Sequence, residues 1–294
     1  MHISIDTSDF AVTGKEKLHL KKRKTKIKDY YKTKSDYREL LEEFQDEING
    51  LQRMMYAHDR YSMLLIFQAM DAAGKDGTIR AIMSGVNAHG ISVQAFKQPS
   101  ATELDHDFLW RTVLRLPQRG RIGIFNRSYY EEVLVVRVHP DIVHDSQKLP
   151  THLTGDLDNL WKQRYESIRD FEKHLQRNGT VVVKFFLHLG RDEQRQRFLD
   201  RLDEPDKNWK FSEGDVAERQ HWDEYQHAYE DAINATATKD APWYVIPADD
   251  KKNMRLIVAQ IVLRHLKALD MQYPQVSESR REELQRYRKR LLDD

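Results

Sequence analysis

Continuous runs of apolar residues, without regular alternation of polar and apolar positions, recur along this chain. They are SMLLIFQ at 62–68, ISVQAF at 91–96, RIGIFN at 121–126, TVVVKFFLHL at 180–189 and PWYVIP at 242–247. Each run has the length of a strand that is buried on both faces. Such strands occur in parallel sheets covered by helices on both sides. We therefore expect an α/β fold.

Amphipathic helical patterns separate these runs. Residues 36–60 carry apolar side chains at helical spacing, and Ser35 is the expected N-cap of this helix. Further helical patterns cover 101–116, 157–177, 192–202, 216–238 and 253–269. The alternation of strand and helix, without an internal repeat, predicts βαβ units. We expect a single three-layer α/β domain over residues 35–276.

Both ends of the chain are strongly charged. Residues 15–34 hold nine lysines and Arg23 against only Glu16 and Asp29. We interpret residues 1–34 as a basic N-terminal arm, and we favour a solvated, mobile arm over an element that docks polyanions. Residues 277–294 have the pattern of a charged helix, which we expect to pack on the protein surface or on a partner subunit.

The composition excludes several classes of protein. The chain of 294 residues has no cysteine, which excludes disulfides, thiol nucleophiles and zinc fingers and fits a reducing cytoplasm. Its first residues do not read as a secretory signal, and its apolar runs are far shorter than the roughly 20 residues that cross a membrane. Aromatic residues do not cluster with basic ones as base-stacking platforms would. We expect a cytoplasmic protein that binds neither membrane nor nucleic acid.

The first strand leads into a loop whose sequence is similar to that of a phosphate-binding P-loop. The usual pattern is Gly, four residues, Gly-Lys and then Ser or Thr. The segment QAMDAAGKDG keeps Gly74 and Lys75, but it has Ala69 at the first glycine position and Asp76 at the hydroxyl position. In such a loop, backbone N–H groups surround a phosphate and the lysine adds positive charge. The residues expected to surround the phosphate are Ala72, Ala73, Gly74, Asp76 and Gly77.

Two carboxylates, Asp71 and Asp76, flank Lys75. They would repel a phosphate unless a metal ion lay between them, and their hard oxygens suit Mg²⁺, or Mn²⁺ in its place. The loop is therefore interpreted as a metal-dependent polyphosphate site, with Asp71 and Asp76 as candidate metal ligands. The pattern alone leaves open an ordinary strand-to-helix turn.

The strand at 121–126 ends in Asn126, which Arg127 follows. Ligands bind at the carboxyl ends of strands in open parallel sheets, so both residues should reach the same crevice as Lys75. Arg127 could stabilise charge on phosphoryl oxygens, or it could form an i,i+4 ion pair with Glu131. Asn126 could be a neutral ligand of a metal or a water.

Basic residues also follow the strand at 180–189. Residues 191–215 are typical of a helical lid that closes over transferring phosphates, although a solvated charged helix is the alternative. The candidate phosphate ligands there are Arg191, Arg197, Arg201 and Lys210. Arg111 belongs to a second basic stretch that leads toward the strand at 121–126, where a plain exposed surface is equally compatible with the pattern.

Four segments together resemble the successive motifs of the polyphosphate kinase 2 family. They are QAMDAAGKDGTIR, FKQPSATELDHDFLWR, GRIGIFNRSYYEEVLVVRVHP and LHLGRDEQRQRFLDRLDEPDKNWKFSEGD. The resemblance covers about residues 59–269. It implies a P-loop fold like that of thymidylate kinase, with a parallel sheet between helices and a helical lid. It also implies reversible phosphoryl transfer from inorganic polyphosphate to AMP or ADP, with Mg²⁺.

The resemblance implies roles for individual residues. Asp71 and Lys75 would be the acid and the lysine of the loop, and Arg127 the arginine after the second strand. Many relatives have Asp-Arg where this chain has Asn126-Arg127, and the NRSYYE version is similar to the single-domain class III branch, which accepts nucleoside mono- and diphosphates. The expected catalytic residues are Asp71, Lys75, Asn126 and Arg127, and the expected nucleotide-binding residues are Arg111, Glu131 and Glu132.

The resemblance also suggests a homo-oligomer, either a dimer or a tetramer. Two other functions fit part of the sequence. An ATP-dependent nucleoside monophosphate kinase would have the same fold, but the absence of Ser or Thr at Asp76 is unfavourable to it. A non-catalytic polyanion-binding module would explain the basic arm, but it would not require Asp71, Lys75 and Arg127 together.

Overall fold

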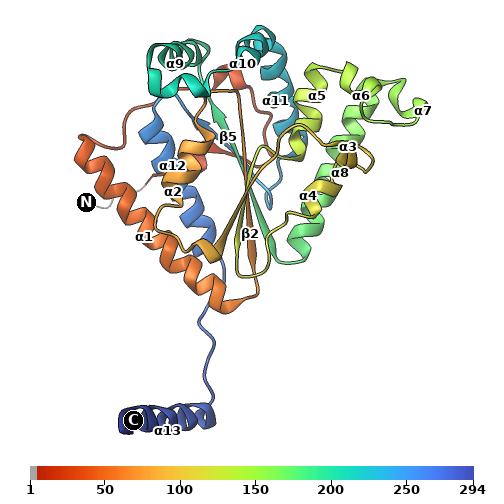
Figure 1. Ribbon diagram of the computed structural model, residues 1–294. Helices are drawn as coiled ribbons and strands as arrows, with labels where there is room; N and C mark the ends of the chain where they lie inside the picture. The colour runs from red at the N-terminus through yellow and green to blue at the C-terminus, as the bar shows by residue number, and fades with distance from the viewer. Residues whose placement is uncertain (1–4) are drawn as a thin grey trace.

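The computed structural model describes residues 5–294, which form a six-stranded sheet with helices on both faces (Figure 1). The strand order is β1-β6-β5-β2-β4-β3. The strands are β1 (Ala11–Val12), β2 (Ser62–Ala69), β3 (Ile91–Ala95), β4 (Ile122–Asn126), β5 (Thr180–His188) and β6 (Trp243–Pro247). All pairs are parallel except β1 with β6. The predicted α/β fold and its five strands are confirmed, and the two-residue β1 was not predicted.

Residues 5–294 form seven longer helices and several short ones, and all of the longer helices except α13 pack around the sheet. The longer helices are α1 (Lys34–His58), α2 (Lys75–Ile82), α8 (Leu157–Arg177), α9 (Arg191–Asp203), α11 (Trp222–Thr236), α12 (Lys251–Lys267) and α13 (Glu278–Asp293). The short α-helices are α3 (Ala101–Leu104), α4 (Trp110–Val113), α5 (Val135–Val138), α6 (Asp141–Asp145), α7 (Thr151–Thr154) and α10 (Glu213–Glu218). The 3₁₀ turns are η1 (Thr7–Phe10), η2 (Leu20–Lys22), η3 (Ala88–Gly90), η4 (Tyr129–Val133), η5 (Pro205–Lys210) and η6 (Arg219–His221).

The sheet separates two apolar layers. Successive side chains of a strand point to opposite faces, so Leu65 and Phe67 of β2 pack with α1, α2 and α12, whereas Leu64 and Ile66 pack with α8 and α11. Figure 1 shows α1, α2 and α12 on one side of the sheet and α8 on the other. Because both faces are covered, β2 is buried along its whole length, which explains its continuous apolar sequence.

Three predicted helices differ from the structure in detail. The N-cap of α1 is Thr33, not Ser35, because Thr33 and Asp36 form a reciprocal capping box. Residues 101–116 are not one helix, since Asp107 accepts a hydrogen bond from the N–H of Leu109 at 2.9 Å, which favours a turn between α3 and α4. Residues 216–238 are likewise divided into the end of α10, η6 and α11.

The N-terminal segment is packed on the domain, which differs from the mobile arm that its charge suggested. β1 adds an antiparallel strand beside β6, and Leu20 is 2% exposed. The N–H of Leu20 donates to the Glu230 carboxylate at 2.7 Å, and the hydroxyl of Thr25 donates to Asp249 at 2.7 Å. Apolar residues between the lysines therefore fix the segment, while the lysines stay in solvent.

The C-terminal helix α13 stands apart from the sheet and its helices, at the end of an extended link (Figure 1). It exposes Leu284, Tyr287, Leu291 and Leu292. Packing on the surface of its own domain, which was one of the two expectations for this helix, is therefore not seen. No helix among residues 5–294 is both long enough and apolar enough to span a membrane.

A buried polar network lies beneath the segment that follows β4. The ammonium of Lys184, on β5, is fully buried and lies 2.5 Å from a carboxylate oxygen of Glu172, on α8. The hydroxyls of Tyr129 and Tyr130 donate to the other carboxylate oxygen at 2.9 and 2.7 Å. The network therefore fixes η4 on the core, directly after Arg127.

Candidate active site

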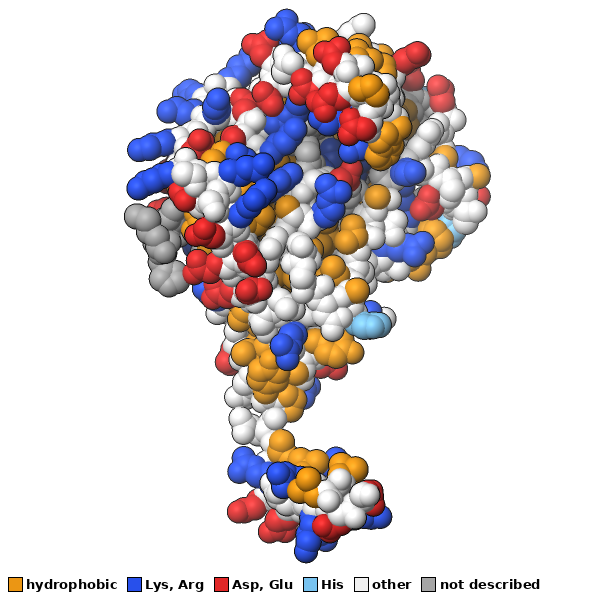
Figure 2. Space-filling view, turned by 60° about the vertical axis from the view of Figure 1, so that its left-hand side comes forward, with side chains coloured by type: hydrophobic (Ala, Val, Ile, Leu, Met, Phe, Trp, Pro, Cys, Tyr) orange, Lys and Arg blue, Asp and Glu red, His pale blue; other side chains and the backbone are white. Residues whose placement is uncertain are grey.

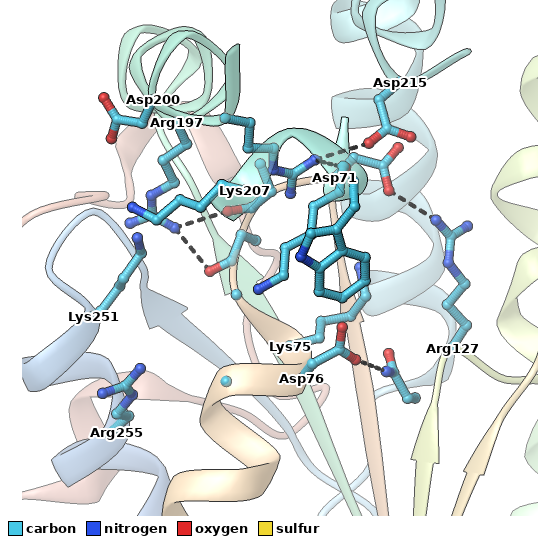
Figure 3. A pocket seen from close by; sticks show the side chains of 18 residues that line it. Asp71, Lys75, Asp76, Arg127, Arg197, Asp200, Lys207, Asp215, Lys251 and Arg255 are labelled. Atoms are coloured by element: carbon cyan, nitrogen blue, oxygen red, sulfur yellow. Dashed lines mark hydrogen bonds and ion pairs between the residues drawn. The ribbon is translucent and has the colours of Figure 1, made fainter. Parts of the chain in front are cut away.

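The carboxyl ends of the parallel strands open into a pocket of about 510 Å³ (Figure 3). The loop after β2, the end of β4 and the helices after β5 and β6 all contribute to it. Its lining residues are Asp71, Ala72, Ala73, Gly74, Lys75, Asp76, Gly77, Asn126, Arg127, Arg197, Asp200, Arg201, Lys207, Trp209, Lys210, Asp215, Lys251 and Arg255. The loop, the strand end and three of the four candidate phosphate ligands in the lid thus face one cavity.

The loop after β2 takes its bend at Ala72 and Gly74, whose φ angles are 62° and 102°. Ala69, which occupies the first glycine position of the usual pattern, is the last residue of β2 and needs no left-handed backbone. Helix α2 begins at Lys75, so the N–H groups of its first turn point toward the loop without intrahelical partners. The loop therefore has a phosphate-type shape without the first glycine.

Arg197, on α9, holds the backbone of this loop in place through hydrogen bonds to its carbonyl groups (Figure 3). Its Nη1 donates to the carbonyls of Ala72 and Ala73 at 3.0 and 2.9 Å, and its Nη2 donates to those of Ala248 and Asp249 at 2.7 and 3.0 Å. Its Nε donates to Glu193 at 2.8 Å. The side chain is 5% exposed, and all five N–H donors of the guanidinium have partners in the protein. This geometry differs from the direct phosphate ligand that the sequence suggested.

Lys75 lies inside the pocket, half-buried. Its ammonium donates to the carbonyl of Ala69 at 3.0 Å. Burial lowers the pKa of Lys75 below its ordinary value, and the nearby Arg127 acts in the same direction, while Asp71 acts against it. An anion that entered the pocket would therefore gain a partly desolvated positive charge at this position.

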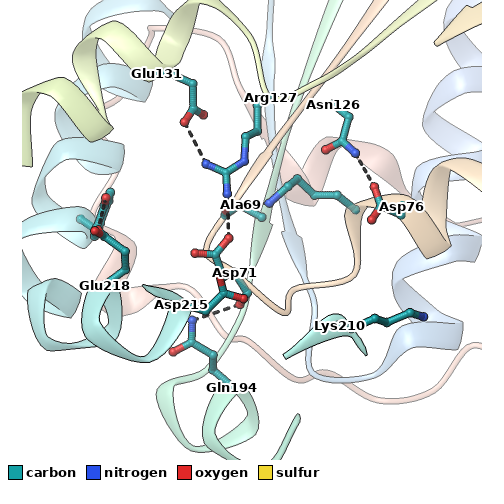
Figure 4. A network of polar contacts seen from close by, with 12 residues as sticks. Ala69, Asp71, Asp76, Asn126, Arg127, Glu131, Gln194, Lys210, Asp215 and Glu218 are labelled. Atoms are coloured by element: carbon teal, nitrogen blue, oxygen red, sulfur yellow. Dashed lines mark hydrogen bonds and ion pairs between the residues drawn. The ribbon is translucent and has the colours of Figure 1, made fainter. Parts of the chain in front are cut away.

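Arg127 connects the loop acid to the segment after β4 (Figure 4). Its Nη2 lies 2.8 Å from Asp71, and its Nη1 lies 3.0 Å from Glu131, so the i,i+4 ion pair that the sequence offered as an alternative forms together with one to the loop. Glu131 and Asp71 raise the pKa of Arg127, which therefore keeps its charge. The φ of Arg127 is 62°, a costly left-handed conformation, and its N–H donates to Phe67 at 3.0 Å.

The second loop carboxylate, Asp76, accepts a hydrogen bond from the side-chain amide of Asn126 (Figure 4). Asp71 and Asp76 line the same pocket but have different partners. Within residues 5–294, no group of three or more His, Cys, Asp or Glu side chains is placed to hold a metal ion. A divalent ion at this position would therefore take at most a minority of its ligands from carboxylates.

The lid residues lie at the open side of the pocket. Arg201 pairs with Asp215 at 3.1 Å, and Lys207, Trp209 and Lys210 belong to η5. Trp209 is 77% exposed although it lines the pocket. Arg191, the first residue of α9, is exposed and does not line the pocket.

A second cavity of about 450 Å³ lies on the other side of Arg127. Arg127 lines both cavities, and the three predicted nucleotide-binding residues, Arg111, Glu131 and Glu132, all line the second. The remaining lining residues are Phe96, Lys97, Gln98, Pro99, Leu104, Val135, Val136, Ile142, Ser146 and Gln147. This cavity is therefore more apolar than the first and has acidic groups at its margin.

Arg111 and Glu132 are held firmly at this second cavity. Arg111 is 8% exposed and donates to the carbonyl of Lys97 at 2.8 Å, so it is not part of a plain exposed surface. Glu132 is buried, lies 3.4 Å from Arg164 and accepts from Gln147 at 2.5 Å. Burial raises the pKa of Glu132, an effect that Arg164 opposes.

Comparison with known proteins agrees with this geometry. A profile of the family described as polyphosphate kinase 2 matches residues 31–274. The chain belongs to the polyphosphate kinase 2 family. An ADP-polyphosphate phosphotransferase of Rhodopseudomonas palustris is 54% identical over 290 residues, which are 99% of this chain and 100% of that protein. An AMP/ADP-polyphosphate phosphotransferase of Meiothermus ruber is 46% identical over 228 residues, covering 78% of this chain and 80% of its own length.

Solved structures of this family share the fold. The crystal structure of polyphosphate kinase 2 from Arthrobacter aurescens TC1 superimposes with a TM-score of 0.85 at 34% sequence identity, covering 97% of this chain and 96% of that one. The P-loop kinase-like α/β fold that the family resemblance implied is thereby confirmed.

Sequence reasoning missed several lining residues of the polyphosphate kinase 2 pocket. Lys251 and Arg255 come from α12, far along the chain, and only the topology brings them to the loop. Asp250 caps α12 by accepting a hydrogen bond from the N–H of Asn253. The sequence DKKN at residues 250–253 was therefore the one signal in the sequence that placed Lys251 in the first turn of a helix.

Proposed function

We propose that the protein transfers the terminal phosphoryl group of inorganic polyphosphate to ADP or AMP, and that it catalyses the reverse reaction. The observation that carries this proposal is the position of Arg127, which lines a basic cavity on one side and a more apolar cavity on the other. A phosphoryl group that moves between two phosphate chains needs a positive charge at their junction. The names of the relatives from R. palustris and M. ruber support the same reaction.

The first cavity is the donor side in this proposal. Its cationic groups come from separate elements and face a common space, as a flexible polyanion of variable length requires. They are Lys75, Arg127, Arg201, Lys207, Lys210, Lys251 and Arg255. The loop backbone at residues 72–77 would hold the terminal phosphate, and Arg197 would support the loop without touching the donor. Arg191 is left out of the phosphate-binding set.

The second cavity is the acceptor side. Phe96 and Leu104 offer apolar surface to a nucleobase, while Arg111 offers a positive charge that its bond to Lys97 keeps in place. Glu131 and Glu132 are suitable acceptors for amino or hydroxyl groups of a nucleoside. Space on this side is sufficient for a mononucleotide, which agrees with the class III branch and its use of both mono- and diphosphates.

A divalent metal fits the donor side. Mg²⁺ is usually held by one or two carboxylates together with substrate phosphates and waters, and Asp71 and Asp76 offer that number of groups. Mn²⁺ would fit the same oxygens. When bound, the ion neutralises charge on the phosphate oxygens of the donor. Asp71 would have to share its carboxylate between the ion and Arg127, and Asn126 would orient Asp76 by its hydrogen bond.

The residues act mainly by position and charge. A terminal phosphate oxygen of the acceptor attacks the end phosphorus of polyphosphate in line, and the bond to the next bridging oxygen breaks. Lys75 and Arg127 stabilise the charge of the transferred group, and no covalent enzyme intermediate is needed. Residues 191–215 act as the lid that excludes water, with Lys207 and Lys210 closing over the donor.

We also propose that the enzyme is a cytoplasmic homo-oligomer, a dimer or a tetramer. The exposed apolar side chains of α13 support this arrangement, because a helix that stands off its own domain can bury them only against another surface. Residues 35–276 would then be the catalytic unit and residues 277–294 the segment that joins subunits.

A coupled assay tests the proposed reaction. Purified protein, Mg²⁺ and ADP or AMP are supplied with long-chain polyphosphate or with ATP as the only donor, and Lys75→Met is the control because it removes charge at similar volume. We expect product from polyphosphate with the wild-type protein and at least about a 10³-fold loss in the variant. Transfer from ATP alone would identify a nucleoside monophosphate kinase. Salt-sensitive polyphosphate binding without any transfer would identify a binding module.

A further inference from the structure

Four lysines alternate along the segment KKRKTKIK of the N-terminus. Lys22, Lys24, Lys26 and Lys28 are exposed, whereas Thr25 and Ile27, which lie between them, are partly buried. Lys22 is the last residue of η2, the chain bends at Arg23 and Thr25, and residues 26–28 have no regular secondary structure. Exposed and partly buried side chains nevertheless alternate over residues 22–28. The lysines therefore form one row on the outer side of a short stretch of backbone, which we call the lysine row.

The lysine row is fixed in place by its inward-facing residues. The backbone of Thr25 accepts from the N–H of Asp249 at 3.0 Å, and its hydroxyl donates to the same residue at 2.7 Å. The N–H of Tyr30 donates to Asn253 at 2.9 Å, and the side-chain amide of Asn253 donates to Lys28 at 3.2 Å. A charged segment held by these contacts differs from a solvated tail, because its cations keep a set position.

The residues that hold the lysine row belong to the loop that supplies the active site. Asp249 lies between Ala248, whose carbonyl accepts from Arg197, and Lys251, which lines the donor pocket. Lys252 lies over the ring of Tyr31, 5.1 Å from its centroid. Lysines therefore occur at intervals from the pocket across the start of α12 to the lysine row, with the carboxylates of Asp249 and Asp250 between them. Figure 2 shows Lys and Arg side chains spread over the upper part of this face, out to its left-hand edge.

The lysine row carries more positive charge than the acidic side chains around it balance. Among residues 5–294, its four lysines form no ion pair with an acidic side chain. The carboxylates of Asp249 and Asp29 lie close to the row, where they accept hydrogen bonds from Thr25 and Gly190 and from Asn253. Lys22, Lys24 and Lys28 also line a groove of about 660 Å³ beside β6, together with Arg23, Asp9 and Asp29. Four cations against two carboxylates in the lining of this groove favour an anionic ligand.

We propose that the lysine row binds the distal part of a long polyphosphate chain whose terminal phosphate lies in the donor pocket. This inference rests on the proposed function. Each phosphate unit carries negative charge, and binding to a row of cations releases counterions, so affinity increases with the number of units that reach the row. A donor of only a few phosphates fills the pocket without reaching Lys24. The lysine row would therefore favour long donors over short ones.

The test compares donors of two lengths. In the full-length protein, Lys24, Lys26 and Lys28 are changed together to Gln, and KM and kcat are measured with long-chain polyphosphate and with tripolyphosphate. We expect KM for the long chain to rise about tenfold, with an unchanged kcat and unchanged constants for tripolyphosphate. The slope of log KM against log salt should fall by about 2, as for the loss of three contacts to a single-stranded polyanion.

The matched control changes Lys162, Lys173 and Lys239 to Gln, which removes the same charge from exposed positions on or near α8 and α11, across the sheet from α12. This control should leave KM for the long chain unchanged. An unchanged KM in the lysine-row variant, or an equal rise for both donors, would overturn the inference. Direct titration with long-chain polyphosphate and with single-stranded poly(dT) adds a readout without turnover, and lost affinity for DNA alone would also overturn it.

The titration separates this inference from the proposed function. If wild-type protein transfers phosphate only from ATP, the proposed function fails, and the lysine row is then judged by polyphosphate binding alone. If transfer from polyphosphate occurs but long and short donors behave alike in the lysine-row variant, the proposed function stands and the inference fails. Because the three lysines are solvated, both variants should unfold at the wild-type temperature.

Discussion

Replacement of Lys184 by Met tests the network beneath the active site. Met has a similar length and keeps the packing with Trp243, but it leaves the buried carboxylate of Glu172 with only hydroxyl donors from Tyr129 and Tyr130. Removal of one partner from a buried ion pair costs about 3 to 5 kcal/mol, because the other charge is left without compensation. We expect the free energy of unfolding, measured by urea titration with circular dichroism, to fall by that amount.

The same change predicts a shift in melting temperature. The unfolding entropy of globular proteins is about 2.1 cal/mol/K per residue, which gives about 0.6 kcal/mol/K for a chain of 294 residues. A loss of 3 to 5 kcal/mol therefore lowers Tm by about 5 to 8 °C, measured by scanning calorimetry. Because Tyr130 lies in η4, close after Arg127, kcat should fall together with stability.

The control is the double variant Lys184→Met with Glu172→Gln. Its neutral amide can still accept from the two tyrosines, so we expect more than half of the lost stability to return. If Lys184→Met stays within about 1 kcal/mol of the wild type, the ion pair contributes little and the reasoning is refuted. If the double variant is less stable than the single one, the carboxylate is stabilised by the tyrosines alone.

Three further predictions concern the site, pH and assembly. Replacement of Arg127 by Lys keeps a charge but removes the contacts to both Asp71 and Glu131, so kcat should fall about 10³-fold with little change in Tm; a loss below tenfold would refute its role at the phosphoryl group. Burial lowers the pKa of His265 from 6.5 to about 4. Between pH 4 and pH 6.5, the unfolded chain therefore binds a proton at this histidine that the folded protein does not bind. The unfolding free energy should therefore be highest above pH 6.5 and fall by up to about 3 kcal/mol toward pH 4, and His265→Gln should show a flatter profile by urea titration. Deletion of residues 277–294 should lower the number of subunits per particle, measured by light scattering, while polyphosphate turnover per subunit persists. An unchanged number of subunits would show that α13 does not join them.

The sheet could be predicted from sequence because burial on both faces leaves a local signature. β2 and β5 are central strands, and their long apolar runs reflect that position directly. The charged terminus was less predictable, because Leu18 and Leu20 are single buried residues among many lysines. The burial of these two leucines depends on the surface that they contact, and this surface is formed by residues more than 200 positions further along the chain.

The site was predictable where the residues were adjacent in sequence. The loop at residues 69–77 and the pair Asn126-Arg127 follow strands, and their positions follow from the rule for strand ends. Lys251 and Arg255 could not be placed, because helical periodicity does not say which turn of α12 faces the loop. The role of Arg197 could not be predicted either, because a charge pattern does not distinguish an arginine that donates to backbone carbonyls from one that binds a phosphate.

The bonds of Arg197 also restrict how the enzyme can open. α9 is attached to the phosphate loop through Arg197 and Gln194, and to the residues before α12 through Arg197, so it cannot swing as a rigid rod without breaking hydrogen bonds to carbonyls on both sides. In the part of the chain that the structure describes, no hydrogen bond joins residues 204–218, which follow α9, to the loop at residues 71–77. Product exchange would then involve a short flap of η5 and α10, released when Arg201 and Asp215 part, while the phosphate cradle keeps its shape between turnovers.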